Sequence, residues 1–577
     1  MLGFYDKARD VLLTLLPICH DFKNHKNHVL KALVFSSLSD LYSVSGDNNT
    51  AQEYALKSIE TANLSKNPLI LASIMNNIGN LFSSKDHFAE SLAIYTRCFE
   101  MLQKSSGKKD NNKMSPIIDS FKRALLSTVL LNKLRVLFQI TQQHNENYRH
   151  GTRSFQPMKN SVAILAKMGI PPQSHTAPLR PTEMIQELKT VNQMIEQQAD
   201  DNSKSINLAA LAVLALTSFE MYTHTPVTPA RNVDPGFQWV QSFTLQVLNR
   251  ALTIAKKTNN SLILAKICGY TGRLHELTGN FQEALEWTQK AILYTPHQYA
   301  PETLYQWYWQ MGRLYQASDQ SVEAIAYLLK AIKILSPIQG EFFQGYHRKT
   351  GVFKEKVKAV YLDLAQQYIT LSRRCTEQKE QHAFLRQVRH VIESLKTAEI
   401  QSFFQDECIA EAGEMKRLQD KSAKTAVLYP IIFQDRLELL VNFGNTIKLY
   451  AIDAGESALC KTVTGFYDRL QQPNNNRFRF YSSRLYTWFI NPIVEDLKKN
   501  EIQTLVISPD GILGLIPFGA LFDGKHYLIE KYAVAVVPGI TLTSQQQKFK
   551  RMNALACGIS CAYGNFPALP HVSDELH

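Results

Sequence analysis

The stretch 504–524 contains the residue of this chain best placed for catalysis. A short apolar run, 504–507, meets Ser508-Pro509-Asp510-Gly511, and a second apolar run follows at once. In α/β proteins, functional side chains gather where a buried strand ends, so Asp510 could serve as an acid or a base. Pro, Asp and Gly are equally the residues of tight turns. The alternative is therefore that Asp510 only turns the chain between two buried segments.

Cys557, Cys561, His571 and His577 suggest two other chemistries. Their spacing, Cys-x3-Cys-x9-His-x5-His, imitates a zinc finger, and a thiol near an imidazole could act as a peptidase nucleophile. Cys557, however, falls within the apolar run ALACG, and the four residues follow the pattern of a larger sheet rather than a small metal-binding unit. We predict neither a metal site nor a catalytic pair here.

Gly519, Gly524 and Lys525 are spaced like a phosphate-binding loop. That motif needs Ser or Thr after the Lys to hold Mg²⁺, and a helix after the loop. Here His526 follows the Lys, and the next residues predict a strand. We expect no phosphate site at this position.

Asp406 and Glu407 stand beside Cys408 in a predicted helix, where a helix cap or a surface pair is a simpler interpretation than an acid–base couple. With this pair set aside, the sequence predicts no catalytic residue, no metal ligand, no cofactor-binding residue and no cofactor within 1–577.

The elements that surround these residues begin with a repeat. Residues 272–292 align with 312–332, and residues 39–59 align with 79–99, each at a shift of 40. Every unit has a small residue, an aromatic or His three positions later, a Gly/Asn/Asp turn, and then Ala or Ser. Small residues allow two helices to approach closely, so the pattern predicts helical hairpins.

This grammar resembles the tetratricopeptide repeat, whose usual period of about 34 residues is shorter. HEAT-like repeats have similar lengths but lack the pattern. We predict tetratricopeptide-like repeats at 1–105 and 235–340, with degenerate helical repeats and long loops, such as 144–160, in 106–234. The fold class is then an α-solenoid, whose groove binds a protein or peptide partner. The individual repeat residues are expected to serve packing.

The helical period continues beyond residue 340 and changes to that of strands after residue 420. Helices continue through 341–420, and short apolar runs follow at 426–433, 436–443 and 446–453. Gly444-Asn445 is typical of a hairpin turn. A long helix is predicted at 479–500, then strands at 502–508, 532–538 and 554–560, with a helix near 541–551. Strands that alternate with helices predict a partial α/β sheet covered on both faces.

Four stretches of this region, 393–408, 505–524, 528–542 and 554–576, resemble the opening half of a CHAT domain, a caspase-like domain that commonly follows tetratricopeptide arrays. We place the incomplete domain at 421–577. The resemblance implies a cysteine peptidase fold whose His, in a His-Gly turn, and Cys, at a strand end, come after residue 576. The dyad is then missing from this chain, which is expected to be inactive alone and to represent a truncated or split gene.

The same resemblance gives Asp510 a structural role in a turn, with Leu513, Ile516, Phe518 and Leu521 as core. The predicted function is partner recognition by the repeats that regulates a caspase-like peptidase domain. One alternative is a non-catalytic interaction scaffold with a degenerate CHAT remnant, and another is a basic solenoid that binds nucleic acid.

Bulk composition supports the nucleic-acid alternative only weakly. Lys and Arg number 63 against 51 Asp and Glu, which gives a net charge of +12, but no long basic block occurs. The longest apolar stretch, 206–216, is much shorter than the ~20 residues of a membrane span, so no membrane contact is predicted. Eight scattered cysteines favour a reducing cytoplasm over a disulfide framework. The oligomeric state is not predicted.

Overall fold

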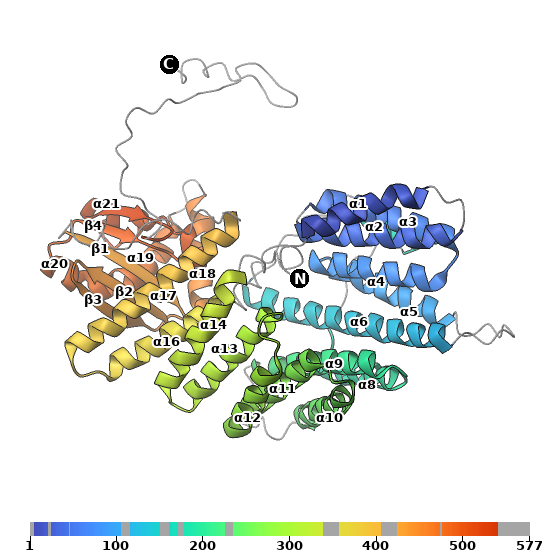
Figure 1. Cartoon of the computed structure of the whole chain (residues 1–577). Helices are drawn as coiled ribbons and strands as arrows, with labels where there is room; N and C mark the ends of the chain where they lie inside the picture. Colours follow the sequence, from blue (N-terminus) through green and yellow to red (C-terminus); the bar gives the residue numbers. More distant parts are fainter. Residues whose placement is uncertain are drawn as a thin grey trace, which may run out of the picture.

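The computed structural model describes residues 5–20, 25–45, 47–104, 116–150, 161–170, 178–224, 235–338, 357–404, 424–472 and 476–540. An arc of helices leads into an α/β unit (Figure 1), which confirms the predicted fold class. The helices before the sheet are α1 (Tyr5–His20), α2 (His25–Ser45), α3 (Asn48–Ser65), α4 (Pro68–Ser84), α5 (Phe88–Lys104), α6 (Pro116–His150), α7 (Ser161–Lys167), α8 (Pro181–Glu196), α9 (Asp201–His224), α10 (Pro235–Thr258), α11 (Ser261–Leu277), α12 (Phe281–Tyr294), α13 (Pro301–Ala317), α14 (Ser321–Leu335), α16 (Ala359–Arg374) and α17 (Gln378–Phe404).

The predicted repeat is confirmed as pairs of helices. The pair α11–α12 recurs 40 residues later as α13–α14, and α3 recurs at the same step as α5. A Cβ added to Gly79 would lie 2.5 Å from the Tyr95 ring, and one added to Gly312 would lie 2.7 Å from Leu328. The small residues therefore permit close helix contact. Ser91 strengthens one such contact by donating from Oγ to the carbonyl of Gly79 at 2.7 Å.

The turn inside each hairpin uses the left-handed backbone region. Gly279 has φ of +80°, and Asp319, at the equivalent position of the next repeat, has φ of +59°. Gly adopts this conformation freely, and Asp tolerates it better than most side chains do. The Gly/Asn/Asp turn predicted from sequence therefore has a backbone reason.

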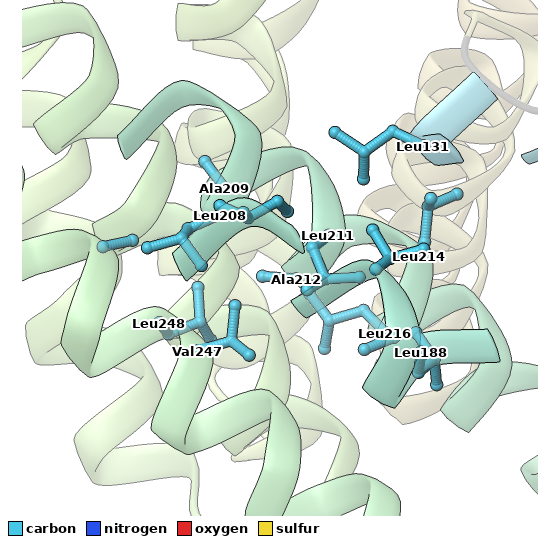
Figure 2. Close-up of a cluster of buried hydrophobic side chains, with 14 of the residues drawn as sticks. Leu131, Leu188, Leu208, Ala209, Leu211, Ala212, Leu214, Leu216, Val247 and Leu248 are labelled. Carbon is cyan, nitrogen blue, oxygen red and sulfur yellow. The ribbon is translucent and has the colours of Figure 1, made fainter. Parts of the chain in front are cut away.

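The middle segment packs as a bundle rather than as regular hairpins. Figure 2 shows leucines of α6, α8, α9 and α10 meeting in one apolar cluster. Helix α6 reaches His150, so the loop predicted from 144 begins seven residues too early; no Gly or Pro occurs before Gly151 to end the helix. Within α6, Ile118–Gln142 is long and apolar enough to cross a membrane, yet 61% of its most apolar window is buried. A core helix passes the same test.

The α/β unit contains a five-stranded sheet in the order β3-β2-β1-β4-β5. Strands β1, β2 and β3 form an antiparallel meander, whereas β1, β4 and β5 run parallel. Their bounds, with the helices between them, are β1 (Thr425–Ile432), β2 (Leu437–Phe443), β3 (Thr446–Ile452), α18 (Glu456–Leu470), α19 (Phe478–Phe489), η6 (Asn491–Ile493), α20 (Val494–Lys499), β4 (Thr504–Ile507), η7 (Gly511–Leu515), η8 (Phe518–Ala520), α21 (Leu528–Lys531) and β5 (Ala533–Val536).

Helices cover both faces of this sheet. One face packs on α18, α19 and α20, and the other packs on α16 and α17, the last helix pair of the arc. Gly444 takes φ of +60° in the β2–β3 turn, as predicted. The single helix expected over 479–500 is wrong: α19 ends at Phe489 and a 3₁₀ turn precedes α20. Pro492 lies in that turn and cannot donate to a continuous helix.

Candidate functional site

Asp510 lies three residues beyond the carboxyl end of β4, next to β1. Ser508 continues the strand, since its N–H donates to the carbonyl of Leu428 at 3.0 Å. Gly511 follows with φ of +50°, and Leu513, Ile516, Phe518 and Leu521 are all buried, as predicted. Asp510 therefore stands at the sheet edge where α/β proteins place functional groups. It is only 3% exposed.

Two lysines from the last helix pair occupy the space in front of Asp510. Lys358, directly before α16, places Nζ 2.6 Å from Asp510 Oδ2. Lys396 of α17 lies 3.5 Å from Oδ1 and donates to the carbonyl of Pro509 at 2.5 Å. Glu399 of α17 lies 3.7 Å from the Lys396 ammonium. Lys358, Lys396, Glu399 and Asp510 form what we call the junction cluster.

The protonation of the junction cluster follows from burial and opposite charge. Burial acts to raise the pKa of Asp510, but Lys358 and Lys396 outweigh it and hold that pKa below the usual value. Burial likewise acts to lower the pKa of Lys358, and the Asp510 carboxylate reverses the shift. Burial and the charge of Asp510 raise the pKa of Glu399. Asp510 is thus held as a paired carboxylate, which suits it to structure and not to proton transfer.

The same helix pair reaches the sheet through further polar contacts. Arg373, near the end of α16, donates from Nη2 to both carboxylate oxygens of Glu438 at 2.8 Å. Glu438 of β2 is fully buried, and its carboxylate also accepts a hydrogen bond from Arg436 Nε at 2.7 Å. On α17, the buried Glu393 accepts the N–H of Ile540, just after β5, at 3.0 Å. Both ends of α16 are therefore tied to the sheet by charge.

A row of charged and aromatic side chains links α16 back to earlier repeats. Arg273 of α11 pairs with Glu220 of α9 at 2.7 Å and with Glu276 at 2.8 Å. Arg313 of α13 donates two hydrogen bonds to the Glu276 carboxylate, at 2.7 and 3.0 Å. We call the row Glu220, Arg273, Glu276, Arg313, Trp309 and Asp363 the polar ladder. It joins four helices, α9, α11, α13 and α16, with α10, α12 and α14 between them in the chain, and Lys358 of the junction cluster directly precedes α16.

At the end nearest α16, the polar ladder passes through an aromatic side chain, Trp309. The guanidinium of Arg313 lies 4.5 Å from the centre of the Trp309 ring, and Trp309 Nε1 donates to Asp363 Oδ2 at 2.6 Å. Burial raises the pKa of Asp363, and the Trp309 donor and the Arg313 charge offset only part of that rise. Asp363 thus differs from Asp510, because it has a neutral donor where Asp510 has two ammonium groups.

The phosphate-loop pattern at 519–526 is filled by the chain itself. Asp523 Oδ1 accepts the backbone N–H groups of Lys525 and His526 at 2.7 Å each, and Lys531 contacts the other oxygen. These donors hold the pKa of Asp523 well below its usual range, the His526 N–H contributing most. A phosphate would meet a carboxylate here. The strand predicted after the loop is wrong, since 528–531 form one helical turn, α21.

The remaining predicted candidates fall outside the described ranges. Cys557, Cys561, His571 and His577 lie after residue 540, and Asp406, Glu407 and Cys408 lie between 404 and 424. Over the described ranges, no group of three or more His, Cys, Asp or Glu could hold a metal. Of the cysteines in these ranges, Cys98 and Cys268 are buried. The absence of a cofactor stays a prediction.

Sequence reasoning found Asp510 and missed its partners. Lys358 is 152 positions away from Asp510, and nothing in its neighbourhood sets it apart from other helix lysines. The one available signal is indirect: Lys396 lies inside the stretch 393–408 that carried the family resemblance.

Comparison with known proteins gives one family match and several distant fold likenesses. The CHAT domain model matches residues 479–577. A circular tandem repeat protein with novel repeat topology is 12% identical, at a TM-score of 0.21, over 70% of this chain and 91% of its own. Yeast Tom70 is 13% identical, at a TM-score of 0.17, over 71% of this chain and 90% of its own.

None of the curated proteins matches the chain in sequence. The low TM-scores leave the repeat architecture to rest on the helix pairs themselves, which recur at the predicted step. The family model begins within α19, and the sheet that it enters starts earlier, at β1. The chain therefore combines tetratricopeptide-like helical repeats with a CHAT domain at residues 479–577.

Proposed function

We propose that the repeats recognise a protein or peptide partner and that this binding regulates a caspase-like cysteine peptidase site belonging to the CHAT domain. The observation that carries the proposal is a shared helix pair: α16 and α17 are the last helices of the arc, and they also cover one face of the sheet. Figure 1 shows these two yellow helices between the green repeats and the orange sheet. A partner that shifts the repeats must move helices on which the sheet packs.

The polar ladder and the junction cluster supply a physical route for such regulation. The ladder ends at Asp363 on α16, and Lys358, directly before the same helix, contacts Asp510 beyond β4. Coupling between sites needs an element that both sites bias. Helix α16 is that element in the proposal, since it is held by α13 on one side and by the sheet on the other.

The chemistry would be nucleophilic attack by a thiolate on a peptide carbonyl, with a histidine taking the thiol proton. The family resemblance places both residues after 576, so we assign no catalytic residue within 1–577 and expect these residues to be inactive alone. Incubation of 1–577 with a broad peptide library tests this expectation. Cleavage that is lost in Cys557→Ala or Cys561→Ala would show that the assignment is wrong and would name the nucleophile.

Regulation through α16 has its own test. Arg313→Met removes the guanidinium that joins Glu276 to Trp309 while it keeps the aliphatic stem. We expect faster hydrogen exchange in α16 and in β4, measured peptide by peptide. Arg250→Met on α10, whose ion pair with Glu196 is 3.5 Å and half-exposed, is the matched control. Unchanged exchange in β4 with Arg313→Met would refute the route and favour an interaction scaffold.

A further inference from the structure

The outer face of α19 carries an unusual set of side chains. Its inner face, which includes Leu485 and Phe489, packs in the sheet core. The outer residues line an open hollow of about 590 Å³. We call this set the arginine face; its members are Arg479, Phe480, Ser483, Arg484 and Thr487.

Both arginines of this face are held in place without a carboxylate. The guanidinium of Arg479 lies 5.3 Å from the centre of the Phe522 ring, and that of Arg484 lies 4.8 Å from the Trp488 ring. Within the described part of the chain, neither guanidinium has an ion-pair partner. Stacking fixes a guanidinium plane and leaves its N–H donors available. The two side chains are therefore set to receive oxyanions.

The residue between the arginines is apolar. Phe480 is 67% exposed, and its ring meets Tyr481 edge-on at 5.3 Å between ring centres. Exposed aromatic rings beside arginines are the residues that dominate protein interfaces. A ligand for this face needs negative groups on both sides of an apolar group. Nucleic acid fits less well, because its backbone calls for a longer row of cations than two arginines supply.

We propose that the arginine face binds an acidic peptide segment of a partner protein, with carboxylates on Arg479 and Arg484 and an apolar side chain against Phe480. The open hollow gives such a segment room for side chains. This surface lies on the CHAT side of the molecule, on the sheet face opposite α16 and α17. The proposal is independent of peptidase activity and of the groove of the repeats.

Fluorescence anisotropy with two labelled peptides tests the proposal. One peptide has glutamates on both sides of a phenylalanine, and the matched peptide has glutamine at each glutamate. The acidic peptide should bind more tightly than the glutamine peptide, and added salt should weaken it. The double variant Arg479→Gln/Arg484→Gln should lose at least about tenfold in affinity, as expected for two charge-assisted contacts. Phe480→Ser, which keeps both arginines, should also weaken binding of the acidic peptide.

The control removes the same charge elsewhere. Arg97→Gln/Arg250→Gln replaces two exposed arginines of α5 and α10 and should leave affinity unchanged. Equal binding of the two peptides would overturn the proposal, as would equal loss in the control. Tighter binding of a single-stranded RNA oligonucleotide, lost in Arg479→Gln/Arg484→Gln, would overturn it in favour of a nucleic-acid surface. All the substituted side chains point outward, so the variants are expected to fold.

Discussion

The contacts within the repeats differ in kind from the contacts between the repeats and the sheet. Paired helices meet through Gly, Ala and apolar side chains, as at Gly79 against Tyr95. The last pair meets the sheet through apolar side chains as well, but it adds buried charge at Asp510 and Glu438. Apolar contact is non-directional, whereas a buried carboxylate needs its cations at defined places.

This difference indicates a division of tasks. Most contacts between stacked hairpins are apolar and tolerate slight bending; the polar ladder is the exception, because Glu276 would lose Arg313 if α11 and α13 slid apart. A shift of α16 or α17 against the sheet would strip Asp510 of its lysines, and the desolvation cost would then be unopposed. The junction therefore has one favoured geometry. A device that relays partner binding needs such a discrete contact at the point where the signal crosses.

Asp510→Asn should have the largest effect on stability. The substitution leaves two ammonium groups, with side chains 12% and 5% exposed, without their carboxylate. We expect a loss of about 3–5 kcal/mol in unfolding free energy, as for a broken buried pair. Urea unfolding, with hydrogen exchange to localise the loss to the sheet, measures it. Asp319→Asn removes an exposed pair with Arg374 and serves as control, at about 0–1 kcal/mol. Equal losses would erase the contrast.

The pH dependence of this loss has a definite sign. Lys358 and Lys396 hold the folded-state pKa of Asp510 below the ordinary aspartate value of 3.8. A lowered carboxyl pKa contributes stability that is complete above the unfolded pKa and disappears as pH falls through the folded one. The difference between wild type and Asp510→Asn should thus be full at neutral pH and shrink below pH 3.8. A difference that stays constant down to the acid end would assign the loss to shape and not to charge.

Gly79→Ala tests the apolar side of the comparison. A new Cβ would lie 2.5 Å from the Tyr95 ring, so the hairpin of α4 and α5 must open or the ring must move. Overpacking of this kind costs about 1–3 kcal/mol. Gly514→Ala is the matched control, because no atom lies within 4 Å of its added Cβ. Thermal unfolding should show a lower melting temperature for Gly79→Ala and an unchanged one for Gly514→Ala. Equal melting temperatures for the two variants would mean that α4 and α5 accommodate the added methyl group without cost.

The same comparison explains what the sequence could predict. The repeat step, the hairpin turn at Gly444 and the core at Leu513 and Phe518 all follow from local patterns, and the structure confirms them. Small residues at fixed spacing report close helix contact because the contact involves neighbours in the chain. Periodicity is an adequate guide wherever the stabilising contact is apolar and local.

Charge contacts at the junction have no local signal. Lys358 and Asp510 are 152 positions apart, and a buried lysine has the same letter as a solvated one. The polar ladder was missed for the same reason, because Arg273 and Glu276 resemble an ordinary surface pair on a helix. The sequence pattern also does not predict two short features: the helix break near Pro492 and the single helical turn α21. Each is only one turn long, which is too short for periodicity to indicate. Long-range polar pairing requires three-dimensional structure to recognise.

Asp363→Asn should act in the opposite direction to Asp510→Asn. Burial raises the pKa of Asp363, so the folded state pays to ionise it, and stability falls as pH rises through that pKa. Asn can still accept the Trp309 N–H, so we expect no loss at neutral pH and a gain of up to about 1 kcal/mol. The gain should vanish at acid pH, where Asp363 is protonated. Thermal unfolding at several pH values measures this, and a loss as large as that of Asp510→Asn would mean that the ladder and the junction are alike.

Asp119→Asn marks the lower end of the scale, because it removes the ion pair with Arg123 and keeps the bond from Arg123 to the carbonyl of Gln197. Arg123 pairs with Asp119 at 2.7 Å on α6, with side chains 47% and 44% exposed. Water screens this pair, and an exposed pair four residues apart on a helix contributes about 0.3–0.5 kcal/mol. The effect should also disappear in high salt, because the Debye length then falls to a few ångströms. Urea unfolding at low and high salt decides the matter: a larger, salt-resistant loss would mean that distance and not burial sets the strength of ion pairs in this molecule, and the contrast between Asp510 and the exposed pairs would fail.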